Sequence, residues 1–204
     1  MNRNTLFDTR LGDVSVFSPT NAQGGGIQFG LSSATLSGGQ GNITVQANAG
    51  TFVSGTGADV VMASFVLPSL TFDQAGRGIE VKAFGSTLAN GNTKTIKLIF
   101  NPSSAVLNGT VGAGGTIIAT TGAITTGGSG WFLTAQVFKY GILASNTQVC
   151  LSGDAQSAAA TLLNSAPQLA TAIEANPILV CLTGNAVTSL TDITWNLFQI
   201  NAMN

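Results

Sequence analysis

The chain has 204 residues, enough for one large domain with a real core, and its eight acidic and seven basic side chains give a net charge of -1. It contains no histidine, which excludes Ser-His and Cys-His catalytic pairs and removes the commonest metal ligand. The Lys and Arg residues are too scattered for a nucleic-acid-binding patch, and no run of roughly 18 apolar residues predicts a membrane span.

The low content of charged residues is the most unusual property of the composition. Charged residues make up 7% of the chain, against roughly 25% in an ordinary soluble domain. None lies between Asp13 and Asp59, or between Lys97 and Lys139. Because interspersed charges normally keep a free monomer soluble, the deficit favours a chain that is covered by partners in a permanent oligomer or a larger assembly. The alternative is a neutral surface rich in Thr, Ser and Asn, as in some secreted β-proteins.

Residues 1–50 are predicted to form an extended, Gly-rich N-terminal arm that attaches the protein to a surface. Up to about residue 22 the sequence is polar with isolated apolar residues, so it cannot build a core of its own. Short strands are predicted at 27–31 and 43–47. In the second, Ile43, Val45 and Ala47 alternate with polar residues. The arm residues predicted to make the attachment are Leu6, Phe7, Leu11 and Phe17.

Residues 51–204 are predicted to form the compact domain, and its first half contains the strongest strand patterns. A strand at 60–67 is closed by Pro68. At 79–83 and 96–100, apolar and polar residues alternate, which predicts two half-buried strands. They are separated by a polar segment containing Asn90-Gly91, so we expect them to pair as antiparallel neighbours joined by a protruding loop.

The second half of the domain continues the same pattern. Strands are predicted at 116–120, 131–140, 142–151, 178–183 and 193–202, and the Ala-rich segment 154–176 fits either short helices or strand plus loop. In the strand that begins at Trp131, Leu133, Ala135 and Val137 share the face of the tryptophan. At least seven short strands with turns between them indicate an all-β, antiparallel sandwich or barrel.

The two cysteines are predicted to be free and buried. Cys150 and Cys181 lie in apolar, strand-like contexts, where an unpaired thiol behaves as a small hydrophobic side chain. A bridge between neighbouring strands is the alternative. Since the sequence starts without an apolar signal peptide, we expect a protein made in the cytoplasm, where disulfides are rare.

The order of these segments resembles the jelly-roll domain of structural proteins from tailed bacteriophages, which include capsid decoration (cement) proteins, head fibres and tail-associated fibres. The resemblance covers about residues 55–204. It is carried by Ala-Ser-Phe-Val-Leu-Pro-Ser-Leu at 63–70, Gly-Arg-Gly-Ile-Glu-Val-Lys-Ala-Phe-Gly at 76–85, Ala-Asn-Gly-Asn-Thr-Lys-Thr-Ile-Lys-Leu-Ile-Phe at 89–100, Trp-Phe-Leu-Thr-Ala-Gln-Val at 131–137 and Asp-Ile-Thr-Trp-Asn at 192–196.

The resemblance implies a non-enzymatic virion protein that is made in the host cytoplasm and lies on the outer surface of the particle. It implies a β-sandwich of jelly-roll type, commonly a homotrimer, whose arm binds the major capsid protein or other virion proteins. The first expectation is a cement protein that stabilises the head through contacts between subunits. The alternative is a head-fibre, neck or tail-fibre component that binds a carbohydrate or receptor, with the polar loop 88–93 contacting the glycan. The family carries no catalytic residues and no cofactor.

Other candidate sites fit structural roles better. The stretch 122–129 has the spacing of a phosphate-binding loop, but Gly128 stands where the lysine must be, so a turn is expected. Asp73 and Glu80 are interpreted as solvated carboxylates rather than an acid/base pair for polysaccharide cleavage. Trp131 and Trp195 are expected in the core rather than on a sugar-stacking platform. Asp and Asn clusters typical of a calcium loop are absent, so no metal site is expected.

Overall fold

The computed structural model describes residues 50–51, 57–125, 128, 130–142, 144–157, 160–162, 167–186 and 192–203. These residues contain eleven β-strands and no helix, which confirms the predicted all-β class. Within these ranges nothing helical is long and apolar enough to span a membrane.

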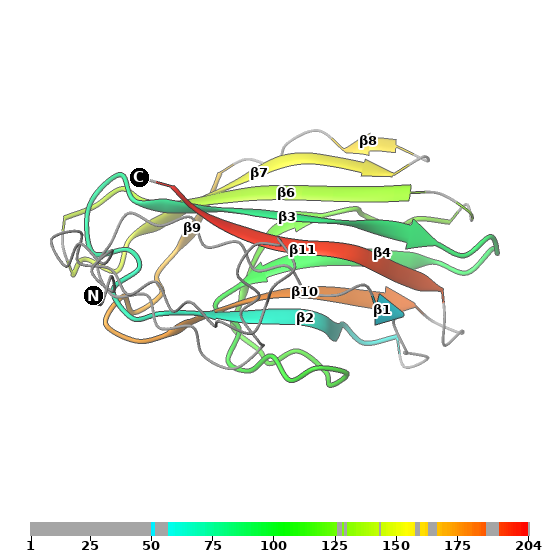
Figure 1. Ribbon diagram of the computed structural model, residues 1–204, viewed down its shortest axis with the longest axis horizontal. Helices are drawn as coiled ribbons and strands as arrows, with labels where there is room; N and C mark the ends of the chain where they lie inside the picture. The colour runs from blue at the N-terminus through cyan, green and yellow to red at the C-terminus, as the bar shows by residue number, and fades with distance from the viewer. Residues whose placement is uncertain are drawn as a thin grey trace, which may run out of the picture.

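The strands form two antiparallel sheets that pack face to face as a β-sandwich (Figure 1). The order in the larger sheet is β1-β11-β3-β6-β7-β8, with β9 also paired to β7, and the order in the smaller sheet is β2-β10-β4-β5. The strands are β1 (Gly50–Thr51), β2 (Val60–Leu67), β3 (Gly78–Thr87), β4 (Lys94–Phe100), β5 (Thr116–Thr120), β6 (Gly130–Lys139), β7 (Gln148–Ser157), β8 (Ala160–Leu162), β9 (Gln168–Ala170), β10 (Ile178–Ala186) and β11 (Ile193–Met203).

The strand pairs are nested along the chain. The innermost pair is β4 with β5, and around it lie β3 with β6, β2 with β10, and β1 with β11, all antiparallel. Successive strands therefore lie in different sheets at β1–β2, β2–β3, β3–β4, β5–β6, β9–β10 and β10–β11.

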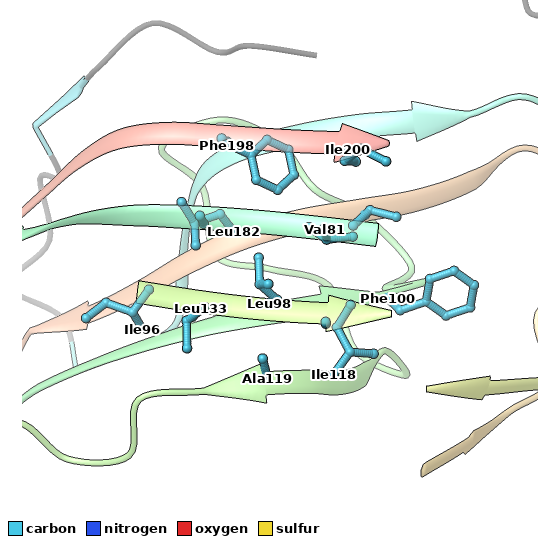
Figure 2. Close-up of a cluster of buried hydrophobic side chains, with 14 of the residues drawn as sticks. Val81, Ile96, Leu98, Phe100, Ile118, Ala119, Leu133, Leu182, Phe198 and Ile200 are labelled. Atoms are coloured by element: carbon cyan, nitrogen blue, oxygen red, sulfur yellow. The ribbon is translucent and has the colours of Figure 1, made fainter. Parts of the chain in front are cut away.

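The core lies between the two sheets and follows the period-two pattern of the sequence. In β3 the residues Ile79, Val81 and Ala83 face inward, and in β6 Leu133 and Val137 do the same; all of them are fully buried. Figure 2 shows Ile96, Leu98 and Phe100 of β4 in the same buried cluster as Leu133 and Phe198 of the opposite sheet. Phe72, from the β2–β3 connection, meets the ring of Phe100 edge to face, with centroids 5.8 Å apart.

The predicted pairing between the segments at 79–83 and 96–100 is wrong. Strand β3 pairs with β6 and β11 in the larger sheet, while β4 pairs with β5 and β10 in the smaller one. The loop 88–93 crosses from one sheet to the other, so the two apolar faces meet across the core instead of lying side by side. Apolar and polar residues alternate in the same way whether two strands pair within one sheet or face each other across the core. The alternation therefore could not distinguish these two arrangements.

The predicted strand at 142–151 is also displaced. The described residues between β6 and Gln148 form no strand; among them Ala144 and Asn146 have positive φ angles of 59° and 50°, and β7 begins only at Gln148. Backbone in the left-handed region cannot continue a strand. In 154–176 the described residues carry strands and turns instead of a helix. The strands at 60–67 and 116–120 have the predicted bounds.

Candidate interaction surface

The outer face of the larger sheet carries two apolar rows separated by a polar stripe. The first row runs across three strands: Phe84 of β3 lies opposite Phe132 of β6 and Leu197 of β11. The side chain of Phe84 is 42% exposed. Because alternate residues of these strands fill the core, these three side chains point away from it.

The second apolar row lies near the other end of the same face. Phe138 of β6 is opposite Val149 of β7, which in turn is opposite Leu169 of β9. The ring of Phe138 lies over Gly78, where an added Cβ would come within 2.5 Å of the Phe138 Cδ1. Leu169 is 68% exposed, so the row ends in a large apolar side chain that faces solvent.

The stripe between the rows contains one acid and one base, which neutralise each other. Lys82 Nζ lies 2.7 Å from Glu80 Oε2, and Asn201 Nδ2 donates to the same oxygen at 3.4 Å. The hydrogen bond from Lys82 lowers the pKa of Glu80, and the bonds from Asn201 and Gln136 act in the same direction against the effect of burial. The charged side chains described on this face therefore cancel, and the rest of the stripe and rows is a mixture of amide and aromatic groups.

Part of the outer face of the smaller sheet is covered by the chain itself. The long β4–β5 connection, seen as the green loop below β2 in Figure 1, packs Ala105 and Val111 against a small buried cluster of Val61, Ile99 and Cys181. The backbone N–H of Val61 donates to Gly109 O at 2.9 Å, which fixes the loop to the sheet. Neither buried hydrophobic cluster of the described chain lies on the outer face of the larger sheet.

A buried ion pair organises the loops at the end of the sandwich where β3 begins and β6 ends. Lys139 Nζ donates to Glu174 Oε1 and, at 2.8 Å, to Ser145 Oγ, and Gln148 Nε2 also donates to Glu174 Oε1 at 2.8 Å. Both charged side chains are buried, and the backbone N–H of Leu70 donates to Glu174 O. These bonds tie the loops 68–77, 140–147 and 171–177 together.

The same end presents an exposed apolar set around that ion pair, which we call the loop-end set. Its members stand on the three tied loops and are largely open to solvent: Leu70, Tyr140, Ile142 and Ile173. At the core of the set, Glu174 Oε2 is the one buried side-chain oxygen or nitrogen of the described chain without a hydrogen-bond partner. The ion pair therefore ties together the loops that carry these exposed apolar residues.

A second buried lysine fixes the opposite end. Lys94 Nζ donates to Asn90 Oδ1 at 2.5 Å and to Asn92 O at 2.9 Å, while the amides of Asn90 and Asn92 donate to the carboxylate of Asp192. Asn90 and Asn92 belong to the loop 88–93, which is expected to contact the glycan under the alternative function. Since its amides are engaged within the protein, the loop has fewer polar groups to offer a sugar.

The structure places the other predicted residues as follows. Leu6, Phe7, Leu11 and Phe17, with the rest of 1–49, lie outside the described residues. Trp131 and Trp195 are buried, which confirms their core role. Asp73 and Glu80 form separate ion pairs with Arg77 and Lys82, so they are not brought together as an acid/base pair.

Both cysteines are free and buried, as predicted. Cys150 faces the main core and Cys181 the smaller cluster, so they lie in different sheets and on different layers. Burial raises the pKa of each thiol to about 12, which leaves almost no reactive thiolate at neutral pH. Among the described residues, no group of three or more His, Cys, Asp or Glu side chains could hold a metal ion.

Comparison with protein-family models, curated proteins and solved structures found no match. The features that sequence reasoning missed are the two buried lysines and the two apolar rows. Lys94 and Lys139 stand at strand ends, where a lysine is normally solvated, so the sequence carries no local signal for their burial. The rows have a weak signal, because Phe84, Phe132 and Phe138 occupy positions of their strands that alternate with the core residues.

Proposed function

We propose that this protein is a non-enzymatic structural component of a bacteriophage virion, acting as a capsid decoration (cement) protein that stabilises the head. The observation that carries the proposal is the outer face of the larger sheet. Among its described side chains, it combines two apolar rows with one self-neutralised ion pair, in a chain with 7% charged residues. Interface cores are depleted of charge and enriched in aromatic side chains, so this composition suits a surface that is covered in an assembly.

We further propose that the sandwich is of jelly-roll type. Its support is the nested pairing of β1 with β11, β2 with β10, β3 with β6 and β4 with β5, together with the repeated crossing between sheets. A jelly roll is a double sheet of eight strands with Greek-key connections. Strands β7, β8 and β9 then extend the larger sheet beyond this eight-strand set, and they bring Val149 and Leu169 into the second apolar row.

Such a protein would work through the area of its contacts rather than through a reactive group. Copies would associate through the two apolar rows, as a homotrimer, and the arm with Leu6, Phe7, Leu11 and Phe17 would bind the major capsid protein or another virion protein. Removing apolar and neutral polar surface from water contributes roughly 25 cal/mol per Å² of apolar area, and a face with few charges loses little hydration energy in return. The contacts would thus resist separation of neighbouring shell subunits.

Deletion of residues 1–22 is expected to abolish attachment while leaving the β-sandwich folded. The reason is that the proposed attachment residues lie in this segment, whereas all described strands begin at Gly50 or later. The measurement is the amount of the protein that co-sediments with purified particles of the phage that encodes it, with circular dichroism as the test of folding. Normal incorporation of the folded, shortened protein would contradict the proposed attachment.

Replacing Phe84 with Asp is expected to shift the isolated protein from oligomer to monomer. A carboxylate in the first apolar row would have to be desolvated without a partner on association, because Lys82 already pairs with Glu80. Light scattering coupled to size-exclusion chromatography measures the mass. Val66→Asp is the matched control, because Val66 is similarly exposed but lies on β2 in the other sheet. A wild-type protein that is a monomer at all concentrations tested would count against the homotrimer.

A further inference from the structure

The connection from β3 to β4 holds an amine, a carboxamide and a carboxylate in contact. Lys94 Nζ donates to Asn90 Oδ1 at 2.5 Å, and Asn90 Nδ2 donates to Asp192 Oδ1 at 2.7 Å. Lys94 and Asp192 are fully buried, whereas Asn90 is partly exposed. Both ends of the Asn90 carboxamide are therefore engaged, the oxygen by an amine and the nitrogen by an acid.

The amine also lies close to the carbon of that carboxamide. Because Nζ is 2.5 Å from Oδ1 and a carbonyl bond is about 1.23 Å long, Nζ is no farther than about 3.7 Å from Cγ of Asn90. Reacting atoms held about 3–3.5 Å apart are poised for attack. Lys94 Nζ donates in addition to the backbone oxygens of Asn90 and Asn92, at 3.3 and 2.9 Å, and these bonds hold the amine in place.

A backbone N–H points at the oxygen that becomes negative when an amine attacks this carbon. The N–H of Asn92 donates to Asn90 Oδ1 at 3.1 Å. Donors at this position stabilise the tetrahedral intermediate of acyl transfer. The side-chain amide of Asn92 donates to Asp192 Oδ2 at 3.0 Å, which fixes the carboxylate beside the nitrogen that would leave. The site thus contains a nucleophile, an acyl carbon, an oxyanion donor and a proton carrier.

We propose that Lys94 and Asn90 form an intramolecular isopeptide bond, with Asp192 carrying the protons. One proton leaves the Lys94 ammonium for the Asp192 carboxylate, which yields a neutral amine and a neutral acid. The amine attacks Cγ of Asn90, and Asp192 protonates Nδ2 as its bond to Cγ breaks. The surplus proton of the attacking nitrogen ends on the released ammonia. The products are one amide, one ammonium ion and the original carboxylate.

The reaction removes a positive charge from the interior, where a charged group is costly. The amide that replaces the Lys94 ammonium is neutral, and the ammonium ion leaves for water beside the partly exposed Asn90. Lys139, the other buried lysine of the described chain, contacts a carboxylate and a hydroxyl group, so it has no carboxamide to attack there. The inference does not rest on the proposed function, because every reacting atom belongs to one isolated chain.

The test is peptide mapping of the purified full-length protein by mass spectrometry. Trypsin does not cut after an acylated lysine, so residues 83–97 should appear as one peptide, lighter than its sequence mass by about 17 Da, the mass of ammonia. Fragmentation should give no ions that separate Asn90 from Lys94, because the ring joins them. Most molecules should carry the bond, and cleavage after Lys139 should be normal. A peptide of full mass, cut after Lys94, would overturn the proposal.

A cyclic imide at Asn90-Gly91 also loses ammonia and has to be distinguished from the isopeptide bond. The imide would leave Lys94 open to trypsin and would hydrolyse at mildly alkaline pH, whereas the isopeptide bond should survive. A light peptide that hydrolyses in this way, or that persists in the variant Lys94→Gln, would overturn the proposal.

The role of the acid is tested by Asp192→Asn, which keeps the size of the side chain but cannot carry the protons. Folded protein of this variant, as judged by circular dichroism, should give the full mass. The matched control is Asp73→Asn, the same substitution in a carboxylate paired with Arg77, which should leave the light peptide unchanged. A folded Asp192→Asn protein that still forms the bond would show that the assigned role is wrong. The wild-type peptide decides the bond by itself, even if this variant fails to fold.

Discussion

Replacing Lys139 with Met should lower the free energy of unfolding by about 3–5 kcal/mol, the usual cost of removing one partner of a buried ion pair. The Lys139 ammonium is fully buried between Glu174 Oε1 and Ser145 Oγ. Without it the Glu174 carboxylate stays buried with the Gln148 amide as its remaining side-chain donor. Three loops are joined through this pair, so the loss should also raise amide exchange in 140–147 and 171–177. Urea denaturation measures the change in free energy.

Two controls separate the ion pair from a general effect of losing a lysine. Lys82→Met removes the partner of Glu80 on the outer sheet face, where the charges stay in contact with water, and should cost less than about 1 kcal/mol. In the double variant Lys139→Met/Glu174→Gln no buried charge is left, so most of the lost stability should return. A double variant no more stable than Lys139→Met would contradict the unpaired charge as the cause.

Replacing Phe100 with Ala should cost about 3–5 kcal/mol, through lost burial and the cavity that remains. Phe100 is fully buried at the end of β4, opposite Val180 of β10 and Thr116 of β5, and its ring packs edge to face on Phe72. Because these contacts come from three parts of the chain, the site cannot collapse around an alanine without moving the sheets. The free energy of unfolding by urea is the measurement.

The matched control is Phe84→Ala, the same substitution on the outer face of the larger sheet. Phe84 is partly exposed in the first apolar row, so the isolated chain should lose only about 1 kcal/mol. If Phe100→Ala and Phe84→Ala destabilise a monomeric preparation equally, Phe84 does not lie on a solvent-facing interaction surface. If Phe84→Ala destabilises only at protein concentrations where the wild type is an oligomer, the face is an interface.

The local pattern of the sequence was sufficient for individual strands. Residues 60–67 and 116–120 were predicted with the bounds that the structure has, and the inward faces of β3 and β6 were read from alternation alone. Alternation works because successive side chains of a strand point to opposite faces, whatever the partner strand is. Where local backbone conformation interrupts it, as at Ala144 and Asn146, the prediction failed despite the apolar residues nearby.

The partners of the strands could not be predicted in this way. A polar loop with Asn90-Gly91 fits a hairpin and a crossing between sheets equally well. Lys94 holds the crossing from nearby, but the carboxylate that accepts from the Asn90 amide belongs to Asp192, 102 positions away. No pattern within a few residues of the loop contains that information.

For the candidate interaction surface, too, the sequence predicted some features and the tertiary structure decided others. The shortage of charge, which favours assembly, and the absence of histidine, which excludes histidine-based catalytic pairs, are properties of the sequence. Only the tertiary structure decided that Phe84, Phe132 and Leu197 form one row and that Lys139 is buried with Glu174, 35 residues away. Which face of a strand is apolar depends on neighbouring residues, whereas what that face meets depends on contacts between distant parts of the chain.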